Sequence, residues 1–310
     1  MTSEQRKEPD VADMIAVESL FTITLEGLEE DRHDFAGPFG RRVFERAAGG
    51  TVTGTHVEGK VLDLLATDYG RASPDGSIRQ FEAEVTIRTD DGIILLMQYR
   101  GRESPTYGEG RSRIQALFQV GAGRLNWLNG IQAIGYGNRH GGVTTIEVCA
   151  LVDPDPATKP LAFGPRRMVE ADFVLRRKSA HNPGAERHVV EAPLGNRYLT
   201  LAEGGGAFSG PRIQGRFLPG YSWSPHRTGL IDGQPLLQYD VKTLLRTDDD
   251  VPVLMSYTGA YSPAYPRGSW MTATLFEVPS GPYAWLNEVQ AVGHGRWDGD
   301  GAEYRVYALR

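Results

Sequence analysis

The sequence predicts an all-β protein built of two tandem antiparallel β-barrel domains related by internal duplication. Three observations predict this fold: one order of motifs occurs twice, short segments alternate apolar and polar residues, and turn-forming dipeptides separate those segments. Long segments with the period of about 3.6 residues that marks amphipathic helices are nearly absent. We therefore expect strands to form the core of both copies.

The duplication is read from residues that recur in register. The triplet Trp127-Leu128-Asn129 recurs 158 positions later, as Trp285-Leu286-Asn287. Further matches at that spacing are Phe118 with Phe276, Gly101 with Gly259, and Arg88-Thr89-Asp90-Asp91 with Arg246-Thr247-Asp248-Asp249. Upstream glycines at 49, 50, 54 and 59 recur 156 positions later. The period is far longer than the roughly 20–50 residues of solenoid repeats, so each copy is expected to be a whole domain.

Within each copy the strands are predicted from alternation. Phe81, Ala83, Val85 and Ile87 alternate with polar residues, and ranges 236–245 and 303–309 show similar short runs. The turn dipeptides between such runs are Asp75-Gly76, Asp91-Gly92, Gly141-Gly142, Asp232-Gly233 and Asp298-Gly299. The best helix candidate is a turn or two around 125–129 and its copy. Closure into barrels would remove the exposed edges of so many strands.

The domain limits follow from composition. Residues 1–15 are expected to be a disordered N-terminus, 16–153 the first barrel and 169–310 the second. The stretch 154–168 contains prolines at 154, 156, 160 and 165 and is predicted to be the linker. We expect the two barrels to pack on each other, and a homodimer is left open.

Composition argues against several classes of partner. The formal net charge is −6, and no basic run is present, so nucleic acid is not expected to be a partner. No apolar run approaches the roughly 20 residues of a membrane span, and the first residues lack the apolar core of a signal peptide. With a single cysteine, Cys149, a reducing cytoplasm is the expected location. The seven histidines show no close ligand spacing and no dinucleotide or phosphate-binding loop is found, so neither a metal nor a cofactor is expected.

The motif order also carries a family resemblance. Gly40-Arg41-Arg42, Gly49-Gly50, Gly54, Gly59, Thr89-Asp90-Asp91-Gly92, Gly101 and Trp127-Leu128-Asn129 stand in an order that resembles domain-of-unknown-function family 3237. The second copy repeats the order, and together the copies cover most of the chain beyond about residue 18. The resemblance implies a small β-barrel much more than it implies a reaction. The architecture is also similar to the allene-oxide-cyclase and dirigent type, whose members bind apolar small molecules inside the barrel.

The resemblance implies a pair of polar positions before the Thr-Asp-Asp turn, an acid and, two residues later, an arginine. These positions hold Glu82 and Glu84 in the first copy, and Asp240 and Lys242 in the second. Alternation places both members of a pair on one face of the strand. Either these charges face water, or the acid lies in a barrel mouth, where burial would raise its pKa and suit it to proton transfer. In the second case Lys242 would keep Asp240 ionised.

Aromatic residues supply the candidate substrate contacts. The Asp-Trp pair of the family survives only in part, as Asp68-Tyr69 and as Ser222-Trp223. The residues expected to contact substrate are Trp223, Tyr257, His226, Tyr221, Tyr99 and Tyr69. Of these, Tyr221, Trp223 and His226 are predicted to form a lid or pocket rim in a loop bounded by Pro and Gly. A further acid, Glu277, has Gln119 as its counterpart.

Two classes of function follow from a barrel with a pocket. The favoured class is a cofactor-independent enzyme that cyclises or isomerises a small, largely apolar intermediate of secondary metabolism, by conformational restraint with acid/base or hydrogen-bond assistance. Asp240, Lys242, Glu277 and Glu82 are its candidate catalytic residues, and the second copy, which keeps three of them, is expected to hold the working pocket. The alternative is a non-catalytic carrier for an apolar small molecule. An enzyme should have a strongly perturbed titratable group in its cavity, whereas a carrier should have an apolar one.

Overall fold

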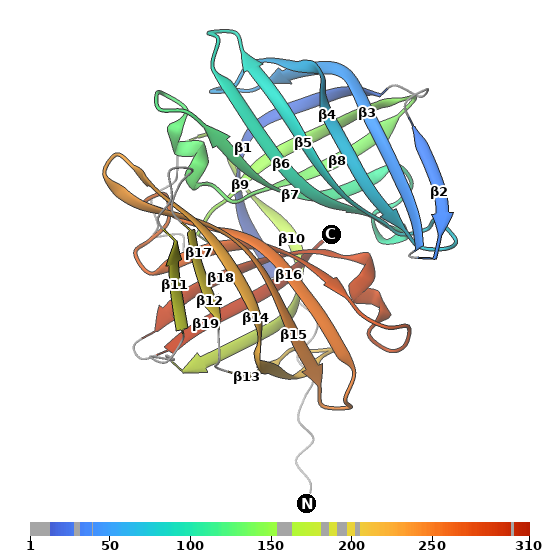
Figure 1. Cartoon of the computed structure of the whole chain (residues 1–310), viewed down its shortest axis with the longest axis vertical. Helices are drawn as coiled ribbons and strands as arrows, with labels where there is room; N and C mark the ends of the chain where they lie inside the picture. The colour runs from blue at the N-terminus through green and yellow to red at the C-terminus, as the bar shows by residue number, and fades with distance from the viewer. Residues whose placement is uncertain are drawn as a thin grey trace, which may run out of the picture.

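The strands of the protein close into two antiparallel barrels, one for each sequence copy. The computed structural model describes residues 13–27, 32–38, 40–153, 163–180, 186–190, 197–201, 205–298 and 301–310. Figure 1 shows the first copy, coloured blue to green, beside the second, coloured yellow to red. The predicted all-β fold with an internal duplication is confirmed.

Eight strands form the first barrel. They are β1 (Asp13–Gly27), β3 (Gly40–Thr53), β4 (Gly59–Ala72), β5 (Arg79–Thr89), β6 (Ile94–Glu103), β7 (Arg111–Val120), β8 (Ala133–His140) and β9 (Val143–Leu151). Each pairs with the next, and β1 closes the barrel by pairing with both β3 and β9. The short strand β2 (His33–Gly37) forms a hairpin with β3, and two 3-10 turns, η2 (Pro105–Tyr107) and η3 (Asn126–Gly130), lie between later strands.

The second barrel repeats this order. Its strands are β10 (Arg166–Ala180), β13 (Gly206–Ser209), β14 (Gln214–Ile231), β15 (Gln234–Thr247), β16 (Pro252–Tyr261), β17 (Ser269–Glu277), β18 (Gln290–Asp298) and β19 (Gly301–Leu309). Strand β10 pairs with β19 and β13, which closes the barrel. A hairpin of β11 (Glu186–Val190) and β12 (Arg197–Leu201) joins β14, and η4 (Ala284–Glu288) matches η3.

The predicted domain limits can be compared with these strands. Strand β10 begins at Arg166, inside the predicted linker 154–168, and pairs with the first residues of β1. The ranges 1–12 and 154–162 lie outside the described residues, whereas residues 13–15, predicted to be part of a disordered N-terminus, belong to strand β1. Among the helical segments in the described ranges, none is long and apolar enough to cross a membrane. The cytoplasmic location stays a prediction.

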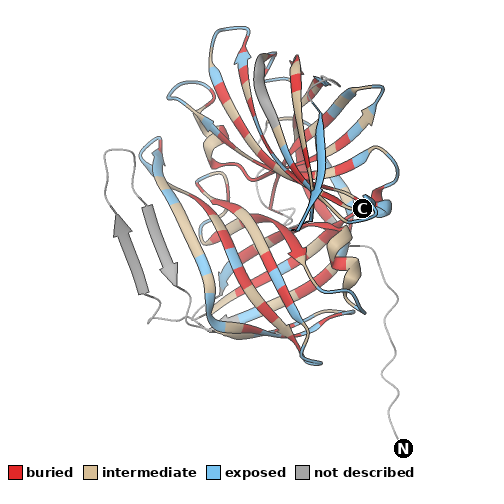
Figure 2. Cartoon of the chain, turned by 45° about the vertical axis from the view of Figure 1, so that its right-hand side comes forward, coloured by how far each residue is buried: buried red, intermediate tan, exposed pale blue. Residues whose placement is uncertain are grey.

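Alternation along the strands separates the barrel interior from the surface. In β5 the burial pattern places Phe81 and Ala83 inside and Glu82 and Glu84 outside, and Figure 2 shows such alternation as red and pale blue bands. Apolar residues fill the interior because removing their surface from water is favourable. The recurring Gly101 has a packing reason: a Cβ there would lie 2.4 Å from the Phe81 ring on the neighbouring strand.

The repeated Trp-Leu-Asn triplet holds a turn against a strand end. The Asn129 side chain donates to the carbonyl of Val120 and accepts from its N–H, and Leu128 is fully buried. Asn287 makes the same two bonds to Val278 in the second barrel. These bonds satisfy backbone groups at the end of a ladder, so the triplet supports the fold.

The barrels are joined by hydrogen bonds that are copies of each other. The phenol oxygen of Tyr107 accepts from the N–H of Gln290, and the phenol oxygen of Tyr265 accepts from the N–H of Gln132. A second reciprocal pair runs from Ser104 Oγ to the carbonyl of Glu288 and from Ser262 Oγ to the carbonyl of Gly130. Each barrel thus presents equivalent groups to the other, as the two subunits of an isologous dimer do.

Candidate functional site

A cavity of about 370 Å³ opens at one end of the first barrel. Its size falls in the range of about 300–1,000 Å³ typical of small-molecule sites. The polar lining comes from strand ends that meet at this rim, including the start of β5, the end of β6 and the end of β8. Phe81, Leu25 and Ile146 supply an apolar wall.

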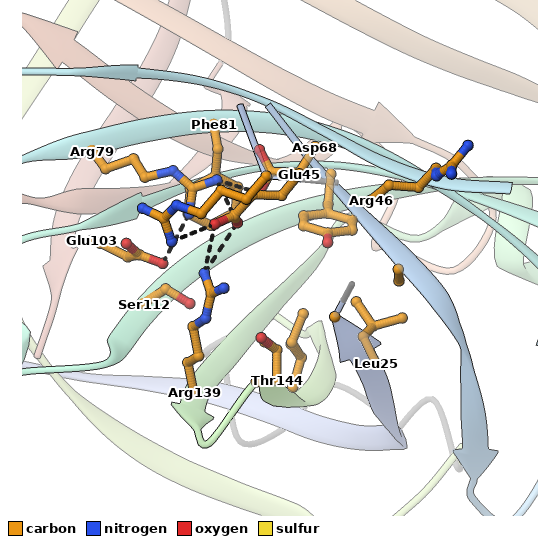
Figure 3. Close-up of a pocket in the computed structure, with 16 residues that line it drawn as sticks. Leu25, Glu45, Arg46, Asp68, Arg79, Phe81, Glu103, Ser112, Arg139 and Thr144 are labelled. Carbon is orange, nitrogen blue, oxygen red and sulfur yellow. Dashed lines mark hydrogen bonds and ion pairs between the residues drawn. The ribbon is translucent and has the colours of Figure 1, made fainter. Parts of the chain in front are cut away.

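One buried arginine organises the polar side of this cavity. Arg79, whose side chain is 8% exposed, lies 2.9 Å from a carboxylate oxygen of Glu45, 2.9 Å from Asp68 and 3.4 Å from Glu103. Figure 3 shows these four side chains gathered together. Three acids around one guanidinium leave too few cations at the centre of the group. We call Glu45, Asp68, Arg79, Glu103 and Arg139 the charge cluster.

Further arginines neutralise only one of the acids. Arg139 donates from Nη1 to both oxygens of Glu45, at 2.9 and 3.0 Å, and Arg32 lies 2.8 Å from the same carboxylate. Burial raises the pKa of Glu45, but Arg79, Arg139 and Arg32 outweigh burial and hold that pKa below its ordinary value. Glu45 is therefore an anion at neutral pH.

Asp68 has the opposite balance. Burial raises the pKa of its carboxyl group to about 7, because Arg79 offsets only part of the desolvation and the charges of Glu45 and Glu103 oppose ionisation. Oδ2 accepts from Arg79, whereas Oδ1 is buried and has no hydrogen-bond partner among the described residues. A carboxyl group in this setting exchanges a proton near neutral pH.

Hydroxyl groups complete the lining. Tyr99 is 7% exposed, and burial raises the pKa of its phenol, so the group keeps its proton at any physiological pH. Ser112 and Thr144 also line the cavity, and Thr144 is the cross-strand neighbour of Arg139. The site thus presents hydrogen-bond donors beside a titrating acid.

The second barrel lacks these charges at the positions equivalent in register. Asp68 pairs with Ala83, and Ser224 occupies the matching place opposite Val241. The counterparts of Glu45, Arg79, Glu103 and Arg139 are Thr200, Leu237, Tyr261 and Trp297. Only the first barrel carries the charge cluster.

Comparison with known proteins adds the family. A model described as a protein of unknown function, DUF3237, matches residues 15–151 and again residues 170–309, and so covers most of the chain. The chain belongs to the DUF3237 family. The resemblance predicted from the motif order is confirmed. No curated protein matches the sequence.

Several solved structures are similar to about half of this chain. A conserved protein of unknown function from Rhodopseudomonas palustris is 22% identical, with a TM-score of 0.40, over 46% of this chain and 99% of that one. A β-barrel-like protein from Acinetobacter baumannii is 20% identical, with a TM-score of 0.38, over 50% and 99%. An enzyme from Penicillium herquei is 19% identical, with a TM-score of 0.35, over 47% and 99%.

The structure places the predicted acids of this DUF3237 chain outside the barrels. Glu82 and Asp240 lie on outer sheet faces and both contact Arg100, Glu82 at 3.2 Å and Asp240 at 2.7 Å. They line a groove of about 410 Å³ between the barrels, together with the predicted contacts Tyr69, Tyr99 and His226. Phe81 and Val241 take the interior positions because apolar groups are favoured there, so of the two placements left open for these acids, the outward one is observed.

The remaining predicted residues are dispersed. Lys242 is exposed, and Glu277 pairs with Arg71 at 3.1 Å on the surface. Tyr257 lies among aromatic rings inside the second barrel, with its ring centre 5.9 Å from that of Tyr304. Tyr99 alone of the predicted contacts lines the cavity of the first barrel.

One local prediction is corrected. The segment containing Tyr221, Trp223 and His226 is a length of strand β14, and the predicted Pro/Gly-bounded loop is absent there. A register shift in the pairing with β15 accommodates Pro219 and Gly220, and the ladder resumes at Ser222. Tyr221 and Trp223 are 62% and 51% exposed on the outer surface.

Sequence reasoning missed most of the charge cluster in this DUF3237 barrel. The sequence pattern presents Asp68 only as the partner of Tyr69 in a partial motif, although Asp68 points inward and Tyr69, at 57% exposed, points outward. The usable signal was the change between copies: acids and arginines stand in the first copy where Ser224, Leu237 and Trp297 stand in the second.

Proposed function

We propose that the first barrel is a cofactor-independent acid/base enzyme that isomerises or cyclises a small molecule. The observation that supports it is a buried carboxyl group, Asp68, with its pKa raised to about 7 in a cavity of ligand size. A catalytic acid or base is most effective when its pKa lies near the working pH. Asp68 is therefore suited both to accept and to return a proton.

The neighbouring residues suit this role. Arg79 holds one oxygen of Asp68, which fixes the direction of the carboxyl group. Tyr99 keeps its proton and can donate to a carbonyl oxygen on which negative charge develops. The wall of Phe81, Leu25 and Ile146 packs against the apolar body of the molecule. In an isomerisation Asp68 takes a proton from one substrate atom and returns one to another, so no oxidant or reductant is needed.

The charged lining of this cavity argues against a non-catalytic carrier for an apolar small molecule. A carrier for an apolar molecule needs a cavity without charged groups, because buried charges cost free energy unless they are paired. Three acids and four arginines line this cavity, among them Asp68 and Arg79. The lining favours a substrate that is apolar over most of its surface and polar at one end.

The test is a set of substitutions in the host strain with metabolites profiled by mass spectrometry. Asp68→Asn and Tyr99→Phe alter the cavity. Ser224→Ala changes the counterpart of Asp68 in the second barrel, and Asp240→Asn removes an acid of the groove between the barrels. Melting temperatures of the purified variants show whether each one folds.

We expect Asp68→Asn to make one intermediate accumulate, and both control variants to leave the profile unchanged. Tyr99→Phe should give a partial accumulation of the same compound. The proposal fails if folded Asp68→Asn protein gives a normal profile, or if Asp240→Asn alone causes the accumulation. The latter result would move the site to the groove.

A further inference from the structure

The described lining of the first barrel's cavity becomes positively charged whenever Asp68 is protonated. Arginines at positions 32, 79 and 139 stand beside acids at positions 45, 68 and 103 in this lining. When Asp68 is protonated, which is a large part of the time near neutral pH, these three arginines face only two other acids. A cavity with a net positive lining attracts anions.

Donor groups face the same space. Arg139 donates from Nη1 to Glu45. Its Nε and Nη2 have no hydrogen-bond partner among the described residues. Figure 3 shows Arg139 reaching Glu45 with one terminal nitrogen while the other turns away from that acid. Within the same described ranges the hydroxyls of Ser112, Tyr99 and Thr144 also have no hydrogen-bond partner, and these atoms are not sealed from solvent.

We propose that the first barrel binds a small organic anion, a molecule with an apolar body and one acidic group that forms an ion pair with Arg139. This inference rests on the proposed function, because it names the substrate class of the same cavity. A guanidinium that already holds Glu45 with one nitrogen is oriented, and its free edge can hold a carboxylate or phenolate oxygen. Ser112 and Thr144 can donate to the same group.

Proton uptake follows from the surroundings of Asp68. The titratable and charged groups that face it are Glu45 from β3, Arg79 from β5, and Glu103 and Tyr99 from β6. A bound anion adds a further negative charge, which favours the protonated form of Asp68. By linkage the anion must then bind more weakly as pH rises past the point at which Asp68 ionises.

The experiment titrates the intact protein with matched pairs of probes by calorimetry. Each pair is an aromatic carboxylate and its uncharged amide, for instance 2-naphthoate with 2-naphthamide and benzoate with benzamide. Titrations are made at pH 6 and pH 8 on wild type, Arg139→Gln, Asp68→Asn and, as a control, Arg216→Gln, an exposed arginine of the second barrel.

We expect at least one carboxylate to bind at least about tenfold more tightly than its amide, and Arg139→Gln to abolish that preference. Wild type should bind the carboxylate several-fold more weakly at pH 8 than at pH 6, and Asp68→Asn should remove this difference while it still binds. The inference is overturned if every amide binds as well as its carboxylate, if no carboxylate binds, or if Arg139→Gln leaves the preference intact.

Failure here is distinguishable from failure of the proposed function. If Asp68→Asn blocks metabolism but no carboxylate is preferred, the enzyme is real and its substrate is uncharged. If carboxylates are preferred through Arg139 but Asp68→Asn has a normal metabolic profile, the barrel binds anions without using Asp68 as a catalyst.

Discussion

Arg79 Nη2 lies 2.9 Å from Oδ2 of Asp68, yet this ion pair does not keep the pKa of the carboxyl group low. An opposite charge at hydrogen-bond distance ordinarily favours the ionised form of an acid. Here burial acts more strongly, and Arg79 is shared with Glu45 and Glu103. A cation that serves three acids cannot fully stabilise the one with the poorest access to water.

The raised pKa of Asp68 predicts a specific pH dependence of stability. Its pKa moves from an ordinary value of 3.8 to about 7 on folding. Between these values the unfolded chain has lost a proton that the folded protein keeps, so the free energy of unfolding falls as pH rises and is level above about 7. The Asp68→Asn variant has no such group to ionise, so its free energy of unfolding does not fall with pH for this reason. Relative to wild type, its free energy of unfolding should therefore rise by up to a few kcal/mol between about pH 4 and pH 7.

Glu45→Gln should show the opposite sign. The pKa of Glu45 is lower in the folded protein than its ordinary 4.5, so its ionised form stabilises the fold above that pH and the benefit is lost as pH falls. The variant should be destabilised near neutral pH and approach wild type in acid. Urea denaturation of all three proteins at several pH values measures both trends. If the stabilities of Asp68→Asn and Glu45→Gln, each relative to wild type, changed in the same direction with pH, the assigned pKa shifts of the two acids would be contradicted.

The recurring glycines predict a matched pair of steric defects. A Cβ at Gly101 would lie 2.4 Å from the Phe81 ring, and one at Gly259 would lie 2.3 Å from the Tyr239 ring. Gly101→Ala and Gly259→Ala should each cost about 1–3 kcal/mol through overpacking. Thermal unfolding measures the loss.

Two further variants separate packing from backbone effects. Gly121→Ala has no atom within 4 Å of the new Cβ and should leave the melting temperature nearly unchanged. Adding Phe81→Leu to Gly101→Ala should recover part of the loss, because the shorter side chain frees the space. If the double variant is no more stable than expected from adding the single losses, the ring contact is not the cause.

The fold was predictable because its signals are redundant. Alternation such as that of Phe81, Ala83 and Val85 appears in both copies, and Gly101 and Asn129 each have a counterpart at the same place in the second copy. The charge cluster was not predictable in this way, because its members come from five strands and meet only at a closed rim. Alternation shows which acids share a face, but Glu82 and Asp68 could be assigned to inside or outside only once the register between β4 and β5 was known.

The two matching tyrosine contacts between the barrels predict that substitutions at either tyrosine destabilise the protein equally. Tyr107→Phe leaves the N–H of Gln290 without its acceptor, and Tyr265→Phe does the same to the N–H of Gln132. A buried donor that loses its partner costs about 1–3 kcal/mol. Both variants should therefore lower the melting temperature by similar amounts. Tyr283→Phe, which removes an exposed hydrogen bond to Asp249, is the control and should have little effect. Unequal losses from the two buried variants would show that the equivalence of the contacts does not extend to their energies.

Arg102, in the first barrel, binds the backbone of the second barrel at three carbonyl groups. Arg102 is 2% exposed and donates to the carbonyls of Phe276, Leu286 and Val289 at 3.0 to 3.2 Å. Burial lowers the pKa of Arg102 to about 10, so it is still charged at neutral pH. Arg102→Leu removes these donors and leaves buried carbonyls unsatisfied, which should cost on the order of 3 kcal/mol or more.

The region in which Arg102→Leu speeds up hydrogen exchange shows which barrel the guanidinium stabilises. Hydrogen exchange should quicken around η4 and the start of β18, in the second barrel, although the substitution lies in β6 of the first. Arg216→Leu, at an exposed position, should leave exchange in this region unchanged. If Arg102→Leu instead quickened exchange only within the first barrel, the guanidinium would stabilise its own sheet. Faster exchange in the second barrel would mean that each barrel depends on donors supplied by the other, so the pair behaves as one cooperative unit.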